Sequence, residues 1–587
     1  MAKFKTRARA IDMLGRQQIA NISTAISELF KNSYDAYADS IEADYFRYNN
    51  LFVLRDDGYG MTETEFTDRW LAVGTESKHE EGNMDSISPP KEKEVRPMMG
   101  EKGIGRLAIS TIGSQVLIIS RAERKGNQFP TVAAFINWRI FESPGIDLDQ
   151  IFIPVEPYPV GTLPSREEVL VLVDMFRDNL KNLKKYIPER LREEILADLE
   201  QFDFDPIQID EYLTGLSLKE SNKKNKLSLR EDKTGTHFYI LPTSNQLASE
   251  IDEEPESEGS APLIKTLIGF TNSMKISSEE TKSGNSEKLN SEKLEPSLSI
   301  RTAFRDHKKE DFYEDLINTQ NFFTQEDFRH TDHLVEGSFD EDGNFHGTVK
   351  IYTQKAIKHT VSKPKGITGK TKCGVFRIKF GYVQGAKAES SLTEMEFNDI
   401  NSKLGKIGGL YVYKDGIRIQ PYGNYDVDYL GLEIRRTKGA GYYFFSYRRL
   451  FGYIEVSRKN NPELAEKAGR EGFIENDAYK HFKRILVNLF LQLATDFFRD
   501  KGRNLGGFQE TKTELEKTHK ILQERQAATN KATIKLRKDL SDLIGKLDGK
   551  IPAEEVAKII EGFSKSVSSL KENLYGNKKG RFVIMIE

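Results

Sequence analysis

Hydrophobic residues recur at two different periods along the chain, and the change of period marks the expected elements. From about Ala10 to Ala38 they follow helical spacing and form one apolar stripe. The segments IEADYF and LFVLRDDG then alternate like two paired strands, and SQVLIIS, TVAAFINW and TGTHFYIL predict three more strands. This mixture predicts a first α+β domain that closes near Thr243.

Two charged stretches adjoin or interrupt this domain. Residues 165–202 have the pattern of a charged amphipathic helical insertion. Residues 246–300 are rich in Ser, Glu, Asn and Lys and are poorly suited to burying a core, so we interpret them as a flexible linker or a surface insertion. We therefore expect the first domain at residues 1–245.

The second half of the chain predicts another α+β domain and a helical end. Over residues 301–505, strands such as CGVFRIKFGYV and LFGYIEVS alternate with helical stretches. Residues 506–587 place leucines on a heptad register that Thr529 interrupts, which favours a weak coiled coil or a helical hairpin. A terminal strand, RFVIMIE, is expected to follow. The predicted fold class is α+β and multidomain.

Composition limits the compartment and the partners. The chain has 587 residues, 87 Lys and Arg against 90 Asp and Glu, and one cysteine. This charge gives no global attraction to nucleic acid or anionic lipid, although local patches could supply one. A single cysteine forms no intramolecular disulfide, and no apolar run approaches the roughly 18 residues of a membrane span. We expect a cytoplasmic protein with no membrane association.

The first candidate chemistry lies in ELFKNSYDA. Glu28, Asn32 and Asp35 follow helical spacing and share one face. A carboxylate that takes a proton from water, beside an amide oxygen that completes a magnesium shell, suits nucleotide hydrolysis. An ordinary solvated helix face would look the same when taken alone.

Two later motifs bring a carboxylate and glycines to turns. DDGYGM, residues 56–61, places an acidic side chain at a strand end, where a buried carboxylate can accept a hydrogen bond from an amine such as that of adenine. GEKGIGR, residues 100–106, supplies three glycines before a helix, so backbone N–H groups can cradle phosphates. WLAVGTESK, residues 70–78, adds hydroxyls and a lysine. The glycine motif is neither a P-loop nor a Rossmann fingerprint.

In this order, the motifs closely resemble the GHKL ATPase superfamily over about 240 residues. The resemblance implies the Bergerat α/β sandwich, ATP and Mg²⁺ as cofactors, Glu28 as general base, Asn32 as magnesium ligand and Asp56 on the adenine amine. It implies a structural role for Asp35, and Lys78, Lys102 and Arg106 are either phosphate contacts or solvated cations. The remaining implied nucleotide-binding residues are Gly58, Gly60, Met61, Gly74, Thr75, Gly100, Gly103, Ile104, Gly105 and Thr236, the last joined to Asp56 through water.

The second half resembles the chaperone, MutL and MORC side of this superfamily, in which the second domain is a transducer. On that analogy a transducer cation reaches the γ-phosphate, with Arg470 the first candidate and Lys438 the second, unless each is a surface cation. The chain departs from the chaperone pattern at Asp39, where those proteins carry a lysine near the nucleotide. That contact must be absent or replaced.

This resemblance implies a slow ATPase that closes as an ATP-dependent homodimeric clamp. The expected client is duplex DNA, in bacterial genome maintenance or phage defence, with a basic groove from RARAIDMLGRQ, GYYFFSYRRL and SRKNN unless these cations are scattered. The alternatives are a chaperone-like ATPase with protein clients, and a nucleotide-gated scaffold whose C-terminal helices recruit a protein partner.

Overall fold

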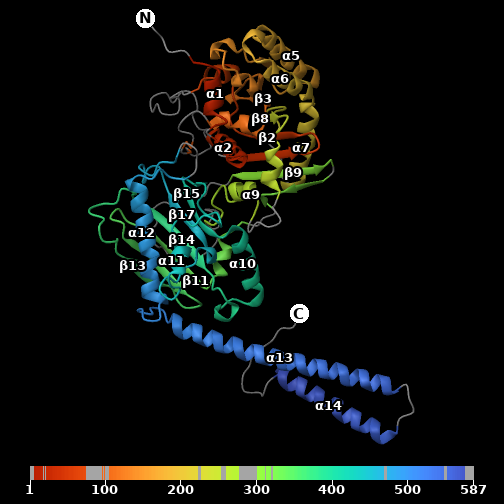
Figure 1. Ribbon diagram of the computed structural model, residues 1–587, viewed down its shortest axis with the longest axis vertical. Helices are drawn as coiled ribbons and strands as arrows, with labels where there is room; N and C mark the ends of the chain where they lie inside the picture. Colours follow the sequence, from red (N-terminus) through yellow and green to blue (C-terminus); the bar gives the residue numbers. More distant parts are fainter. Residues whose placement is uncertain are drawn as a thin grey trace.

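The molecule consists of three parts arranged along its long axis, as Figure 1 shows. The computed structural model describes residues 6–17, 19, 21–73, 96, 98–99, 105–221, 227–252, 260–275, 300–310, 312–318, 322–467, 472–547 and 552–575. An N-terminal sheet domain is followed by a second sheet domain and by a projecting pair of helices. Among the described helices, none is both long and apolar enough to cross a bilayer.

The N-terminal domain is built on an eight-stranded mixed sheet in the order β10-β9-β1-β2-β8-β3-β6-β7. The expected strand pair is confirmed, because β1 and β2 are antiparallel with Ile41 opposite Asp56. The strands span Ser40–Phe46 (β1), Leu51–Asp56 (β2), Gln115–Arg121 (β3), Thr131–Asn137 (β6), Val155–Tyr158 (β7), Gly235–Ile240 (β8), Arg301–Lys309 (β9) and Phe312–Asp315 (β10), and a small hairpin joins Glu123–Arg124 (β4) to Asn127–Gln128 (β5).

Helices cover both faces of this sheet. Successive side chains of a strand point to opposite faces of the sheet. The contacts of Arg55 and Asp56 therefore identify the helices that cover each face. Arg55 contacts Glu42, which accepts a hydrogen bond from Ser217 of α7, whereas Asp56 accepts one from Ser33 of α2. The helices of this domain are Arg9–Leu14 (α1), Ile22–Asp35 (α2), Ile109–Ile112 (α4), Arg166–Asn182 (α5), Glu189–Gln201 (α6), Pro206–Ser221 (α7), Gln246–Ile251 (α8) and Pro262–Leu267 (α9).

The expected boundary at residue 301 is wrong, because β9 and β10 complete the first sheet. β9 pairs in parallel with β1, from Ser40 opposite Arg301 to Phe46 opposite His307. Arg305 is fully buried and forms ion pairs with Glu42 and Asp44 of β1. Breaking a buried pair of this kind would leave an unpaired charge in the core, so β9 is bound firmly into the N-terminal domain.

Two other expectations for this region change. The helix expected from Ala10 to Ala38 is divided, because α1 ends at Gly15 and α2 begins after the N-cap Asn21. A Cβ at residue 15 would lie 2.9 Å from the Leu107 carbonyl, so the chain passes too closely there for a larger residue. Within the expected linker 246–300, α8 and α9 are ordered helices packed against α2.

The helical insertion extends beyond its expected end at residue 202. It comprises α5, α6 and α7, joined by the 3₁₀ turn Lys184–Tyr186 (η5). Phe176 of α5 and Phe202 after α6 pack edge-on against Phe135 of β6. The apolar face predicted for the insertion therefore covers the sheet.

The second domain contains a seven-stranded sheet in the order β13-β12-β11-β14-β17-β15-β16, with a core of its own. β15 and β17 are parallel, and the other pairs are antiparallel. The strands span His333–Phe339 (β11), Phe345–Ile351 (β12), Ile357–Val361 (β13), Phe376–Tyr382 (β14), Gly409–Lys414 (β15), Ile417–Arg418 (β16) and Leu450–Val456 (β17). The helices are Glu394–Ile407 (α10), Leu432–Thr437 (α11) and Asp477–Leu493 (α12), which continues as the π-helix Ala494–Phe498 (η11).

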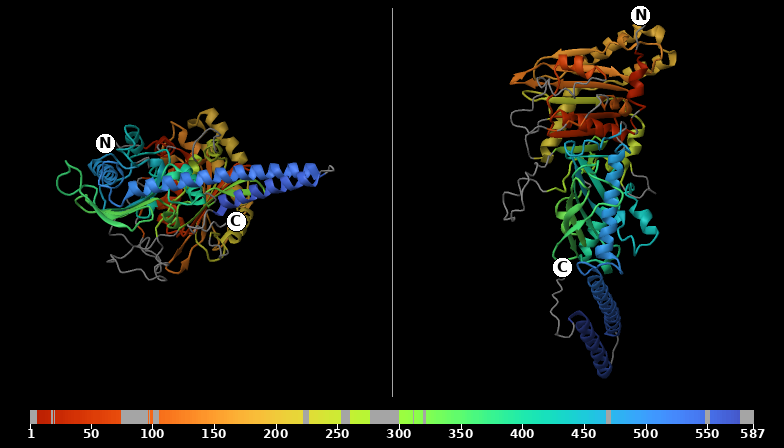
Figure 2. Two further views of the ribbon diagram at one scale, coloured as in Figure 1. Left: turned by 90° about the horizontal axis from the view of Figure 1, so that it is seen from below. Right: turned by 90° about the vertical axis from the view of Figure 1, so that its left-hand side faces the viewer.

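The chain ends in a helical hairpin, one of the two arrangements expected there. Phe508–Leu547 forms the long helix α13, and Ala553–Tyr575 forms α14, which returns along it (Figure 2). The Ser566 hydroxyl donates to Asp539 at 2.8 Å across the two helices. The segment RFVIMIE, predicted as a strand, lies outside the described residues.

Short helical turns complete the fold. They span Glu63–Glu65 (α3), Phe66–Trp70 (η1), Gly105–Ala108 (η2), Trp138–Glu142 (η3), Leu148–Gln150 (η4), Glu326–Arg329 (η8), Lys387–Glu389 (η9) and Tyr447–Arg449 (η10). The motif GEKGIGR therefore leads into η2 and the four-residue α4, a much shorter helix than its sequence suggests.

Candidate functional site

Helix α2 carries the first set of candidate side chains, and its N-terminus is fixed from two directions. The Asn21 side chain accepts a hydrogen bond from the Thr24 amide at 2.8 Å, as an N-cap residue does. The Glu250 carboxylate of α8 accepts from the amides of Ile22 and Ser23 at 3.0 and 2.8 Å. A carboxylate at this position also complements the positive end of the helix dipole. The next turns are thereby held in place.

Glu28 and Asn32 face the start of η2 from one side of α2. A Cβ at Gly105 would lie 3.2 Å from Glu28 Oε2 and 3.8 Å from both the oxygen and the nitrogen of the Asn32 amide. The predicted general base and the predicted magnesium ligand therefore face the same small space. Glu28 is 3% exposed, and its Oε1 lies 3.1 Å from the ammonium of Lys31, which is equally buried.

Asp56 lies at the end of β2 and is held by three hydrogen bonds. Its Oδ2 accepts from the Ser33 hydroxyl at 2.7 Å, and its Oδ1 accepts from the amides of Gly58 and Thr236 at 2.9 and 3.2 Å. Burial raises the pKa of Asp56 from 3.8 to about 6, although the three donors act in the opposite direction. At neutral pH the group is thus a carboxylate whose remaining lone pairs can accept from an amine.

The turn after Asp56 fits the predicted base pocket and depends on glycine. Gly60 has φ +60°, and a Cβ there would lie 1.8 Å from the Arg121 carbonyl oxygen. The Met61 amide, one residue later, donates to the Ser120 hydroxyl at 2.9 Å. The Arg124 guanidinium donates to the carbonyls of residues 59 and 60 at 2.8 and 2.9 Å, which fixes the turn against the β4–β5 hairpin.

Thr236 reaches Asp56 by a different route from the one expected. Its backbone amide donates directly to the carboxylate, and its hydroxyl lies 2.8 Å from that of Ser120. The predicted neighbour is correct, but the hydroxyl faces β3 because β8 lies between β2 and β3 in the sheet. The structure thus adds a direct backbone contact between the two residues, and the link through water stays a prediction.

Arg106, a predicted phosphate contact or solvated cation, binds backbone carbonyls. Its guanidinium donates to the carbonyls of Arg69 and Trp70, both at 2.6 Å, and to that of Ala72 at 3.0 Å. Burial lowers the pKa of this guanidinium. The structure therefore gives Arg106 a role in fixing the end of η1, and a phosphate contact by this side chain stays a prediction.

The remaining acidic residues of the motif are structural. Asp35 accepts from the Met99 amide at 2.6 Å, in agreement with the structural role expected for it. Asp39, where the chaperone pattern carries a lysine, pairs with Arg96 at 3.0 Å. The Arg96 guanidinium also donates to the Ala38 carbonyl and lies 5.3 Å from the Tyr34 ring centre. The Arg96 guanidinium thus brings a positive charge next to Asp39 from another segment of the chain.

Several predicted residues lie elsewhere or outside the described part of the chain. Lys438 is exposed at the C-terminal end of α11 in the second domain, and its contact with the γ-phosphate stays a prediction. The predicted residues outside the described ranges are Gly74, Thr75, Lys78, Gly100, Lys102, Gly103, Ile104 and Arg470.

The donor set around Asn32 fits a magnesium nucleotide. Within the described ranges, no group of three or more His, Cys, Asp or Glu side chains could hold a metal on its own. Magnesium in nucleotide sites needs no such cage, because one or two protein oxygens, the phosphates and water complete its shell. The Asn32 side-chain oxygen, next to Glu28, would be the protein ligand. The bound ion would neutralise phosphate charge.

Some site residues were not anticipated from the sequence. Ser33 and Ser120 hold Asp56 and Met61, and Gly235 has φ +143°, with a Cβ position 1.9 Å from the Asp56 carbonyl oxygen. Lys31 pairs with Glu28. A signal was available for Lys31, because residues three apart on a helix are neighbours. The contacts of Ser120 and Gly235 depend on strand order, which periodicity does not give.

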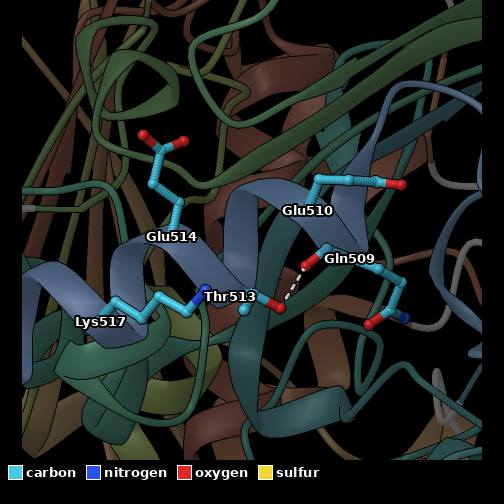
Figure 3. A pocket seen from close by; sticks show the side chains of 5 residues that line it. All are labelled: Gln509, Glu510, Thr513, Glu514 and Lys517. Atoms are coloured by element: carbon cyan, nitrogen blue, oxygen red, sulfur yellow. Dashed lines mark hydrogen bonds between the residues drawn. The ribbon is translucent and has the colours of Figure 1, made fainter.

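Two hollows elsewhere are poorer candidates for a nucleotide. One lies beside the first turns of α13, where Figure 3 shows the side chains of Glu510, Glu514 and Lys517 pointing in different directions. The Thr513 hydroxyl there donates to the Gln509 carbonyl at 2.8 Å. This lining brings together two carboxylates, which would repel phosphates. The other hollow lies between α10 and η10 in the second domain.

Comparison with known proteins agrees with the geometry of the first domain. A family model described as histidine kinase-, DNA gyrase B-, and HSP90-like ATPase matches residues 20–142. No curated protein matches the chain significantly. The matched range contains Glu28, Asn32, Asp56, Gly60 and Gly105, the residues that form the site. This match supports a GHKL-type fold for residues 20–142, in agreement with the resemblance of the motifs.

Proposed function

We propose that this protein hydrolyses ATP slowly and uses the cycle to close and open a homodimeric clamp on duplex DNA. The observation that carries the proposal is that α2, which bears Glu28, is bound to Asp56 of β2 through the Ser33 hydroxyl. One carboxylate is positioned to receive a proton from water, and the other is positioned to accept from the adenine amine. The expected cytoplasmic location and a role in genome maintenance or phage defence belong to this proposal.

The hydrolytic step requires few groups. Glu28 accepts a proton from the attacking water, whose oxygen forms the new bond to the γ-phosphorus while the bond to the bridging oxygen breaks. A well-placed general base of this kind contributes about 100-fold or more to the rate. Gly105 lies beside Glu28 Oε2, so the start of η2 approaches the proposed general base closely.

A rigid connection between the site and the second domain supports a transducer role. The turn after α9 packs on α2 through Phe270 and Phe30, whose ring centres are 5.7 Å apart. The buried Arg418 guanidinium donates to the carbonyls of Lys265 and Ile268 at 2.8 and 2.7 Å. A displacement of α2 would therefore move β16. The relation to MORC, MutL and the chaperones rests on this second domain and remains part of the proposal.

The distribution of cations bears on the client. In RARAIDMLGRQ, Arg7 pairs with Asp147 at 2.9 Å and Arg16 pairs with Glu142 at 2.5 Å. These pairs weaken the contribution of this segment to a basic groove, so binding of DNA would depend on the second domain, where Arg448 is exposed. DNA binding should then decrease steeply as salt increases. Salt-independent client binding would favour the chaperone-like alternative.

A scaffold with negligible turnover is the second candidate, favoured by the projecting hairpin. The exposed residues Ile521, Leu522 and Ile534 of α13, with Ile560 of α14, give a partner apolar surface. On this interpretation nucleotide binding changes the position of the hairpin, and a protein partner recruited there supplies the activity. Hydrolysis would then be dispensable for biological function.

The test compares the wild type with Glu28→Gln, with and without duplex DNA. We expect slow magnesium-dependent hydrolysis by the wild type, and a variant that binds ATP, does not hydrolyse it and accumulates as a dimer in light scattering. A wild type that neither hydrolyses nor dimerises with ATP would contradict the clamp. Full biological activity of the variant would favour the scaffold.

A further inference from the structure

A buried lysine lies one helical turn from the proposed general base. Lys31 is 4% exposed, and its Nζ lies 3.1 Å from Glu28 Oε1. Lysine is almost never this buried unless it is paired, because an ammonium is costly to remove from water. An exposed ion pair at the same spacing would stabilise the helix equally well. Helix stability alone therefore does not explain why this pair is buried.

The other charged side chains on the described elements packed against α2 are engaged elsewhere. Glu250 of α8 caps the helix, Lys265 of α9 pairs with Asp426 at 3.0 Å, and Arg106 of η2 donates to carbonyls at the end of η1. Glu28 has further interactions besides Lys31. Among the described residues, Lys31 is the cation that contacts the Glu28 carboxylate directly, and this contact is buried.

The two oxygens of Glu28 therefore lie in different surroundings. Oε1 is bound to the Lys31 ammonium, and Oε2 lies toward Gly105, within 3.2 Å of the position that a Cβ would occupy there. The ion pair therefore restricts the rotamers that the Glu28 side chain can adopt. Its second oxygen points toward Gly105 at the start of η2.

We propose that Lys31 is a positioning residue for hydrolysis, which rests on the proposed ATPase function. The ammonium holds Glu28 so that Oε2 faces the attacking water. The water proton moves to Oε2, the hydroxide oxygen bonds to the γ-phosphorus, and the bridging oxygen leaves with ADP. Lys31 keeps its own proton throughout. A misplaced base costs up to about 100-fold in rate, so the effect of losing Lys31 should be large.

The first experiment separates turnover from binding in the full-length protein. In Lys31→Met, kcat for ATP should decrease by about 10-fold to 100-fold, while the dissociation constant for a fluorescent ATP analogue should change less than about threefold. Lys31→Arg keeps the charge and should recover part of the lost rate. Lys379→Met is the matched control, because Lys379 is also buried and pairs with Glu336 at 3.2 Å in the second domain.

The second experiment needs no turnover. Thermal unfolding of the nucleotide-free protein is measured for the wild type, Lys31→Met, Glu28→Gln and the double variant. Losing the lysine alone leaves a buried carboxylate without this counter-ion, so Lys31→Met should unfold at the lowest temperature. The double variant should recover most of that loss, because the charge and its partner are removed together.

Several results would overturn the proposal. One is an unchanged kcat in Lys31→Met when wild-type hydrolysis depends on Glu28. A large loss of nucleotide affinity would show that Lys31 contacts the nucleotide itself, and an equal loss of kcat in Lys379→Met would show a general effect of removing a buried charge. Additive unfolding shifts would show that the two side chains are not coupled. A wild type without Glu28-dependent hydrolysis would instead contradict the ATPase function, and the unfolding experiment would still test the pair.

Discussion

Replacing Asp56 with asparagine should stabilise the free protein and abolish its use of ATP. The side chain is 3% exposed, and asparagine has nearly the same shape. The amides of Gly58 and Thr236 would still donate to Oδ1, and the Ser33 hydroxyl would turn to accept from the new NH₂ group. All three local hydrogen bonds therefore survive, and only the buried charge is lost.

The size of the gain follows from the pKa of Asp56. Burial raises this pKa from 3.8 to about 6, and such a difference corresponds to about 3 kcal/mol. Because the folded-state pKa is the higher one, the contribution to stability is fully present below pH 3.8 and is lost as pH rises through 6. Above that pH the wild type carries the full cost of the buried carboxylate, and the variant does not.

The assay is urea unfolding of both proteins between pH 4.5 and 8, with calorimetric titration of ATP at pH 7.5. We expect the stability difference to increase across the lower part of this range and to level off above pH 6 at about 3 kcal/mol in favour of the variant. ATP affinity should decrease by about 100-fold or more, because the new NH₂ group opposes the adenine amine, donor against donor.

A matched control separates charge removal from loss of the adenine contact. Asp332 of the second domain is a buried carboxylate whose pKa is also raised by burial, and it accepts hydrogen bonds from Gln384, Ser390 and Ser391. Asp332→Asn should leave ATP affinity unchanged. The reasoning is refuted if Asp56→Asn is less stable than the wild type at pH 7.5, or if it binds ATP normally.

Two glycine positions give further predictions. Gly60→Ala should destabilise the domain by about 3 kcal/mol or more, because its Cβ would lie 1.8 Å from the Arg121 carbonyl oxygen. The control Gly126→Ala, with φ +82° and open space around its Cβ, should cost about 1 kcal/mol. Equal unfolding midpoints of the two variants would refute this difference. Gly105→Ala should lower kcat by about 10-fold or more with little change in ATP affinity, because its Cβ crowds Glu28 Oε2. A normal rate in single-turnover kinetics would show that residue 105 moves away from Glu28 before hydrolysis.

The sequence predicted those parts of the site that are local in the chain. Glu28 and Asn32 share a face because of helical spacing, and Asp56 lies at a strand end because the turn signal follows it directly. The expected strands β1, β2, β3, β6 and β8 are present, since each has a clear apolar run. Where one helix or strand carries the whole motif, its local sequence pattern was sufficient to predict the element and the face on which the side chains lie.

What the sequence did not predict depends on contacts between distant segments. β9 joins the first sheet because Arg305 is buried against Glu42 and Asp44, more than 250 residues earlier, and no periodicity encodes that pairing. The carbonyl contacts of Arg106 were not predicted, because a glycine-flanked arginine suggests either a phosphate contact or a solvated cation. Carbonyl groups at the end of η1 lie close enough to bind it instead.

Through its contacts, helix α2 connects the candidate nucleotide site to the rest of the molecule. Its N-terminus is held by Glu250 of α8, its middle carries Glu28 and faces Gly105, and Phe30 packs on Phe270. The same turn that carries Phe270 accepts hydrogen bonds from Arg418. Helix α2 is therefore bound at its N-terminus and near its middle to segments beyond the matched family region. The proposed coupling needs no long pathway, since α9 contacts α2 and also accepts a hydrogen bond from Arg418 of β16.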